Sequence, residues 1–234
     1  MNNIKDNLNG CNIKSVLPHF SIGVNILGTI KPRMLYSLGG MYSSCHYKKT
    51  DSGIVMETNI TIPQLSQLTG ESIDYIGDVF YPHIKKQEQL ILSYTSLYDK
   101  VSHQRRNKFI MATPIKPYRI YWSSIFRDTL LTPEEKGYIM ALYMLCVTGA
   151  RRYELNNHRI AKSLGVTLNT WKKYKSILED KGILKKARDL GIGLFDPVTD
   201  DSNIIFYPHV GTNPHLTFVS SQLGEERVLE ESLN

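Results

Sequence analysis

The sequence predicts an α+β protein made of two tandem winged helix-turn-helix domains. Three observations predict this fold class. A helix-turn-helix pattern followed by a basic hairpin lies in the second half of the chain, the same order of elements recurs in the first half, and prolines mark a break between the halves. The predicted organisation is a flexible arm at 1–14, a first winged-helix domain at 15–113, a linker at 114–117, a second winged-helix domain at 118–222 and an acidic tail at 223–234.

The clearest pattern is RRYELNNHRIAKSLGVTLNTWKKYKSILEDKGIL, residues 151–184. A short helix at 158–163 leads into Leu164-Gly165-Val166, where glycine can take the positive φ of a sharp turn. Thr167 can cap a second helix. The apolar side chains of that helix recur at spacings of three and four, so they share an inward face: Trp171, Tyr174 and Leu178.

The opposite, outward face of this second helix is polar and basic. Its amides and hydroxyls can read base edges in a major groove, and its lysines can contact phosphates. An ordinary solvated helix face has a similar composition, so the pattern leaves both interpretations open. The candidate DNA-binding residues of the helix are Thr167, Asn169, Thr170, Lys172, Lys173 and Ser176.

A short apolar strand and a basic stretch follow this helix. Lys181-Gly182 has the form of a helix C-cap, and Ile183-Leu184 begins the strand. We expect the β region to continue to about residue 219, with IIFYP and HLTFV as strands. The candidate DNA-binding cations of this wing are Lys185, Lys186 and Arg188.

The helices of the first half are predicted to repeat this order. A helix opened by Lys31-Pro32 should run from Arg33 to about His46, a second from Ile62 to Leu68, and a third from its cap at Ser72. The side chains predicted to face inward on the third helix are Ile76, Val79, Phe80 and Ile84.

A basic loop at 100–108 is predicted between strand-like segments at 90–92 and 109–111. It is interpreted either as the wing of the first domain or as a solvated loop. As a wing, its candidate DNA-binding residues are Arg105, Arg106 and Lys108.

The two helix pairs are not equivalent. Alignment of LSQLTGESIDYI with IAKSLGVTLNTW predicts that the first pair presents Asp74, Asp78 and Tyr81 outward, and Pro82 should interrupt its second helix. Because carboxylates repel phosphates, we expect the second domain to read the major groove. The first domain should contact DNA through its basic loop or bind a protein. Alternatively, one of its aspartates could accept a hydrogen bond from a cytosine amino group.

The charge of the chain favours a polyanionic partner such as double-stranded DNA. The formal net charge is +6, although the last eleven residues carry −3. Three separated cysteines with no CxxC spacing are typical of free thiols in a reducing compartment. With no long apolar run and a polar N-terminus, the sequence predicts a soluble, cytoplasmic protein without a membrane partner.

Catalytic motifs are lacking in the sequence. The seven histidines include no His-hydrophobe-His metal pair of the kind a rolling-circle nuclease needs, and no GxxxxGK[ST] phosphate-binding loop occurs. We therefore expect a binding protein that is not an enzyme, with no cofactor and no metal.

The segment YRIYWSSIFRDTLLTPEEKGYIMALYML, together with the helix-turn-helix, resembles the N-terminal domain of phage replisome organisers over about 70 residues. The shared helix start is Leu131-Thr132-Pro-Glu-Glu-Lys136-Gly137. Two tandem winged helices in a small basic chain also resemble plasmid replication initiator (Rep) proteins. The resemblance implies binding of repeated sites at an origin and recruitment of a replicative helicase or its loader. A transcription regulator of the same fold and a protein-binding adaptor are the alternatives, and a homodimer is left open.

Overall fold

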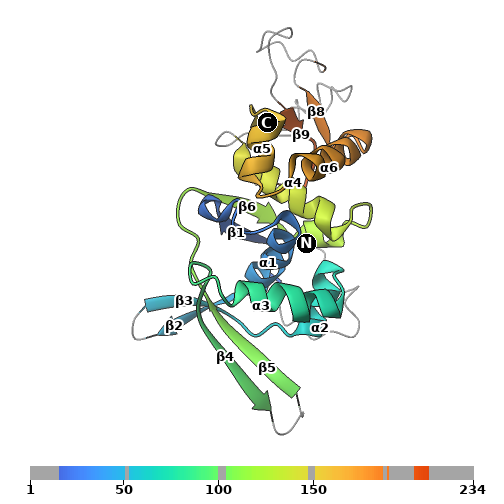
Figure 1. Ribbon diagram of the computed structural model, residues 1–234. Helices are drawn as coiled ribbons and strands as arrows, with labels where there is room; N and C mark the ends of the chain where they lie inside the picture. The colour runs from blue at the N-terminus through green and yellow to red at the C-terminus, as the bar shows by residue number, and fades with distance from the viewer. Residues whose placement is uncertain are drawn as a thin grey trace, which may run out of the picture.

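The computed structural model describes residues 16–50, 53–99, 104–146, 151–186, 189 and 203–210. Within these residues the chain is a mixed α+β structure with six α-helices and three small antiparallel sheets (Figure 1). The sheets have the strand orders β1-β6, β2-β3-β5-β4 and β7-β9-β8.

Within its described residues, the first half contains ten elements in chain order. They are β1 (His19–Gly23), the 3-10 helix η2 (Val24–Ile26), α1 (Pro32–Ser43), β2 (His46–Thr50), β3 (Gly53–Thr58), α2 (Ile62–Thr69), the π-helical segment η3 (Tyr75–Phe80), α3 (Tyr81–Ile84), β4 (Ile91–Asp99) and β5 (Gln104–Met111).

The part of the second half that the structure describes contains eight elements. They are β6 (Tyr118–Trp122), the 3-10 helix η4 (Ser123–Arg127), α4 (Pro133–Leu145), β7 (Arg152–Tyr153), α5 (Asn157–Ser163), α6 (Leu168–Asp180), β8 (Leu184–Lys186) and β9 (Asn203–Ile205).

Helices α1 and α4 pack against each other at the centre of the molecule (Figure 1). A capping box at Thr132 and Glu135 fixes the start of α4, as the Thr-x-x-Glu pattern predicts. The helices approach so closely that a Cβ atom on Gly137 would lie 2.0 Å from the carbonyl oxygen of Pro32. Only glycine therefore fits at this crossing.

The residue before this glycine is also buried. Lys136 is 3% exposed, and its Nζ donates to the carbonyl oxygen of Asp128 at 2.6 Å and to the hydroxyl of Tyr36 at 3.3 Å. Burial lowers the pKa of Lys136, and the nearby Asp128 carboxylate opposes that effect. The Lys-Gly pair that carried the resemblance thus has a packing role here.

The two halves share one core. Strand β1 pairs antiparallel with β6, with Phe20 opposite Tyr121 in the register. The buried side chains of both halves form a single hydrophobic cluster. The division into two domains with the boundaries given above stays a prediction. The described residues do not include the arm at 1–14, the tail at 223–234 or the predicted strand HLTFV.

The order of elements does recur in the two halves, 95 residues apart. In each half a strand and a 3-10 helix precede a proline-initiated helix, which is followed by a short helix, a glycine turn and a second helix. The turn glycines Gly70 and Gly165 both have positive φ, of 72° and 65°. The internal repeat predicted from the sequence therefore has a structural counterpart in the order of elements.

Two sequence predictions were wrong for the helix η3–α3. Val79, predicted inward, is 45% exposed, whereas Tyr81, predicted outward, is 1% exposed and donates its hydroxyl to the carbonyl oxygen of Ile60. The π-helical segment explains both, because the amide of Tyr81 bonds the carbonyl of Ile76, five residues back, and shifts the helical period. The helix also continues past Pro82 to its end at Ile84.

The strands of the first half are longer than predicted. The helix expected to reach His46 ends at Ser43, and the antiparallel strands β2 and β3 follow it. The predicted loop at 100–108 is partly strand, since β5 begins at Gln104. The hairpin β4–β5 projects from the body, at the opposite end of the molecule from α6 (Figure 1).

No helix in the part of the chain that the structure describes is long and apolar enough to cross a membrane.

Candidate nucleic-acid interface

Helices α5 and α6 are joined by a tight turn. The side chain of Asn156 caps α5 by accepting from the amide of Arg159, and Thr167 caps α6 by accepting from the amide of Thr170. Between the helices Gly165 adopts φ 65°, and the amide of Val166 bonds the carbonyl of Ala161 at 3.0 Å. The sequence prediction for both helices, the glycine turn and the Thr167 cap is confirmed.

The inner face of α6 is fixed by aromatic packing. Trp171 is fully buried, and its indole N–H donates to the side-chain oxygen of Asn157 on α5 at 2.9 Å. Tyr174 stacks on Tyr138 of α4 with ring centroids 4.2 Å apart. Burial and a hydrogen bond with Glu134 raise the pKa of Tyr174 to about 12, so the hydroxyl is neutral at physiological pH.

The end of α6 is tied to the start of α4. The amide of Ile183 bonds the carbonyl of Leu178, and Gly182 has φ 68°, which together form the predicted glycine C-cap. Lys181 donates to the Glu135 carboxylate at 2.9 Å and to the carbonyl of Leu130 at 3.0 Å. The orientation of α6 is therefore set at its inner face and at its C-terminal end.

The outer face of α6 is exposed, as predicted. Lys172 and Lys173 extend from the helix, and no ion pair within the described residues neutralises either of them. Thr170 is only partly exposed, and its hydroxyl lies 2.8 Å from that of Thr167. The predicted site residues exposed on this helix are Thr167, Asn169, Lys172, Lys173 and Ser176.

Sequence reasoning missed the cations of α5. Three of its basic side chains are exposed beside the turn: His158, Arg159 and Lys162. The first helix of a helix-turn-helix crosses the DNA backbone, so its exposed cations are placed where phosphates would lie. The same helical-wheel reasoning would have found them had it been applied to this short helix.

The predicted wing of the second half is described only in part. Lys185 and Lys186 lie on β8, and both are partly exposed. The Nζ of Lys185 sits 5.5 Å from the centroid of the Phe206 ring. Arg188 lies outside the described residues.

The predicted wing of the first half has a different environment. Arg105 and Arg106 lie in β5, in register with Tyr98 and Leu97 of β4. Lys108 forms an ion pair with the buried carboxylate of Glu57 at 2.9 Å, so part of its charge is already neutralised. The prediction that these three cations contact DNA stays a prediction.

The helix pair of the first half carries the opposite charge. Residues 156–178, which span α5 and most of α6, contain five Lys and Arg side chains and no Asp or Glu. The equivalent residues 61–83 contain three Asp and Glu side chains and no Lys or Arg. One of these acids, Glu71, is buried and bound to Arg33 through three hydrogen bonds of 2.9, 3.1 and 2.6 Å. Asp74 and Asp78 are exposed.

Comparison with protein-family models, with curated protein sequences and with solved structures gives no significant match. Among the described residues, no group of three or more His, Cys, Asp or Glu side chains is arranged to hold a metal ion.

Proposed function

We propose that this chain is a sequence-specific double-stranded DNA-binding protein that inserts α6 into the major groove as the recognition helix of a winged helix-turn-helix. One observation carries the proposal. The inner face of α6 is locked by Trp171 and Tyr174, while its outer face presents lysines, an amide and hydroxyls, with no acidic residue before Glu179. A rigid helix with this outer face can position hydrogen-bonding groups against base edges.

The surroundings of α6 support phosphate contacts on both sides. The exposed cations Arg159 and Lys162 of α5 would meet the backbone next to the groove, and Lys185 and Lys186 of β8 would meet it as a wing. Each lysine or arginine that neutralises a phosphate releases a counterion, so the affinity should fall steeply with salt.

Replication initiation at an origin is the role we favour for this binding. The resemblance to replication initiators and replisome organisers supports it, and so does the tandem order of elements in the two halves. In this role the protein would bind repeated sites and recruit a replicative helicase or its loader in the cytoplasm. It would not itself catalyse a reaction.

Two other functions fit the same surface. A transcription regulator would bind a single operator with the same helix. A protein-binding adaptor would use the helix pairs without DNA, and the acidic first pair is the observation that favours it.

Fluorescence anisotropy over a salt series tests the proposal. The full chain is titrated with labelled fragments of its own replicon, including the region beside its gene. Tight, salt-sensitive binding to a fragment with repeats supports the initiator, and binding to a single operator supports the regulator. Weak binding that ignores sequence would contradict both and leave the adaptor.

A further inference from the structure

The outer face of the helix η3–α3 carries carboxylates, which repel DNA, and apolar side chains exposed to solvent. We call this the acidic face, made of Ile73, Asp74, Asp78 and Val79. Ile73 is 55% exposed and Val79 is 45% exposed. Both aspartates are exposed, and no ion pair within the described residues involves either one. Exposed apolar side chains rimmed by polar groups mark a surface that can bind a protein.

The π-helical segment creates this face. In a regular α-helix Val79 would fall on the inner side, as the sequence pattern predicted. The hydrogen bond from the Tyr81 amide to the Ile76 carbonyl moves Tyr81 inside and leaves Val79 outside, next to Asp78. Rare π-helical segments are frequent at functional sites.

A surface of complementary charge exists on the same chain. We call this the basic face, made of Arg159, Lys162, Lys172 and Lys173 on α5 and α6, all of them exposed. The two faces lie on equivalent helix pairs, and the aspartates are four residues apart, one turn along their helix. The basic face lacks any acid and the acidic face lacks any cation, so like faces repel and unlike faces attract.

We propose that the acidic face of one copy of this chain binds the basic face of a second copy. The proposed function places DNA on the basic face, so contact between two copies would compete with DNA binding. This regulatory role rests on the proposed function. The association itself needs only the two surfaces. It depends on few charges at the protein surface, so it should be weak and weaken with salt as the screening length falls from about 10 Å at 0.1 M to about 3 Å at 1 M.

Charge exchange between the faces tests the proposal by sedimentation velocity at low salt. One variant carries Asp74→Lys and Asp78→Lys, and the other carries Lys172→Glu and Lys173→Glu. The first variant presents two basic faces, and in the second the new glutamates offset Arg159 and Lys162, so the self-association of each should weaken by about tenfold or more. In an equimolar mixture the unchanged basic face of the first variant can meet the unchanged acidic face of the second, and association should return toward the wild-type level.

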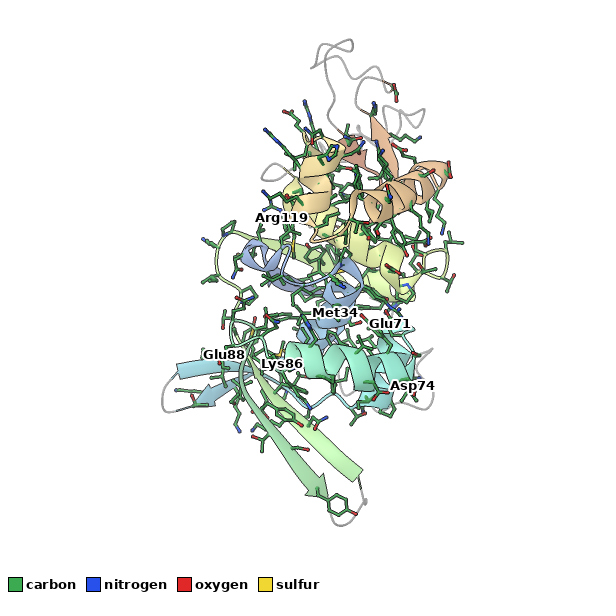
Figure 2. The ribbon with its side chains drawn as sticks, in the orientation of Figure 1. Met34, Glu71, Asp74, Lys86, Glu88 and Arg119 are labelled. Carbon is green, nitrogen blue, oxygen red and sulfur yellow. The ribbon has the colours of Figure 1, made fainter. Side chains whose placement is uncertain are left out.

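Matched controls reverse charges elsewhere. Glu88→Lys changes an exposed acid in the turn that follows α3, away from Asp74 at the start of η3 (Figure 2). The pair Lys49→Glu and Lys86→Glu changes two exposed lysines of the first half. These variants should associate like the wild type. Circular dichroism spectra verify that every variant is folded.

Two results would overturn the proposal: a wild-type chain that stays monomeric at low salt, or a mixture that associates no better than its separate components. DNA titrations distinguish this failure from failure of the proposed function. The Asp74→Lys, Asp78→Lys variant keeps the basic face and should bind DNA at least as tightly as the wild type. If it binds DNA while the mixture stays monomeric, only the association between copies is refuted.

Discussion

The substitution Gly137→Ala tests the central packing of the two halves. Gly137 lies inside α4, where alanine is the better helix former by about 1 kcal/mol. In the structure, however, the new Cβ atom would lie 2.0 Å from the Pro32 carbonyl oxygen and 2.9 Å from the Arg33 amide nitrogen, whereas ordinary contact begins at 3.4 Å. Both obstacles are backbone atoms of α1, so no side-chain rotation can relieve the clash.

The helices must therefore separate by more than an ångström at their crossing. Overpacking of this kind costs about 1–3 kcal/mol and more where backbone must move, which outweighs the gain in helix propensity. We expect a net loss of about 2–3 kcal/mol. For a chain of this length, about 2–4 °C is lost per kcal/mol, so the melting temperature should fall by about 5–10 °C.

Thermal unfolding followed by circular dichroism measures the effect, with Gly77→Ala as the matched control. Gly77 also lies in a helical segment, but a Cβ atom there meets only the Ile62 side chain at 3.6 Å. The control should leave the melting temperature unchanged or raise it slightly. A Gly137→Ala variant as stable as Gly77→Ala would refute the close α1–α4 crossing.

Two further predictions concern the support of α6 and the pH dependence of stability. Trp171→Ala should lower the free energy of unfolding by about 3–5 kcal/mol in urea titrations, because it empties a fully buried site; a loss below about 1 kcal/mol would contradict that burial. Burial raises the pKa of Asp128, but hydrogen bonds from the Tyr207 hydroxyl and the Leu130 and Leu131 amides outweigh burial, so its pKa is lowered overall. The stabilisation is present above the unfolded pKa and is lost as the pH falls through the lowered folded pKa, below about pH 4. Asp128→Asn should therefore be less stable than the wild type at pH 7, with a gap that narrows toward pH 3, and a gap independent of pH would contradict the hydrogen-bonded carboxylate.

Local signals predicted the helix pair of the second half well. Thr167 and Gly165 act within a few residues of their own positions, so their cap and turn are legible in the sequence. The spacing of Trp171, Tyr174 and Leu178 likewise fixed the inner face of α6, because a regular α-helix has one period.

The errors come from interactions that the local pattern does not contain. The π-helical hydrogen bond between Tyr81 and Ile76 changes the helical period, and no spacing rule signals it. Lys108 was predicted as a free cation, but its partner Glu57 lies 51 positions away and is brought beside it only by the β3–β5 pairing. The need for glycine at position 137 likewise depends on Pro32 of another helix.

The most direct test of the central claim is the DNA affinity of the variant with Lys172→Ala and Lys173→Ala over a salt series. The control variant carries Lys49→Ala and Lys86→Ala, two exposed lysines away from α6 (Figure 2 labels Lys86). If α6 lies in the groove, the first variant should bind at least about tenfold more weakly, and the slope of log K against log salt should fall by about two, at roughly 0.9 per lost phosphate contact. The control should match the wild type in both. An unchanged slope and affinity for the α6 variant would contradict the placement of DNA on this helix.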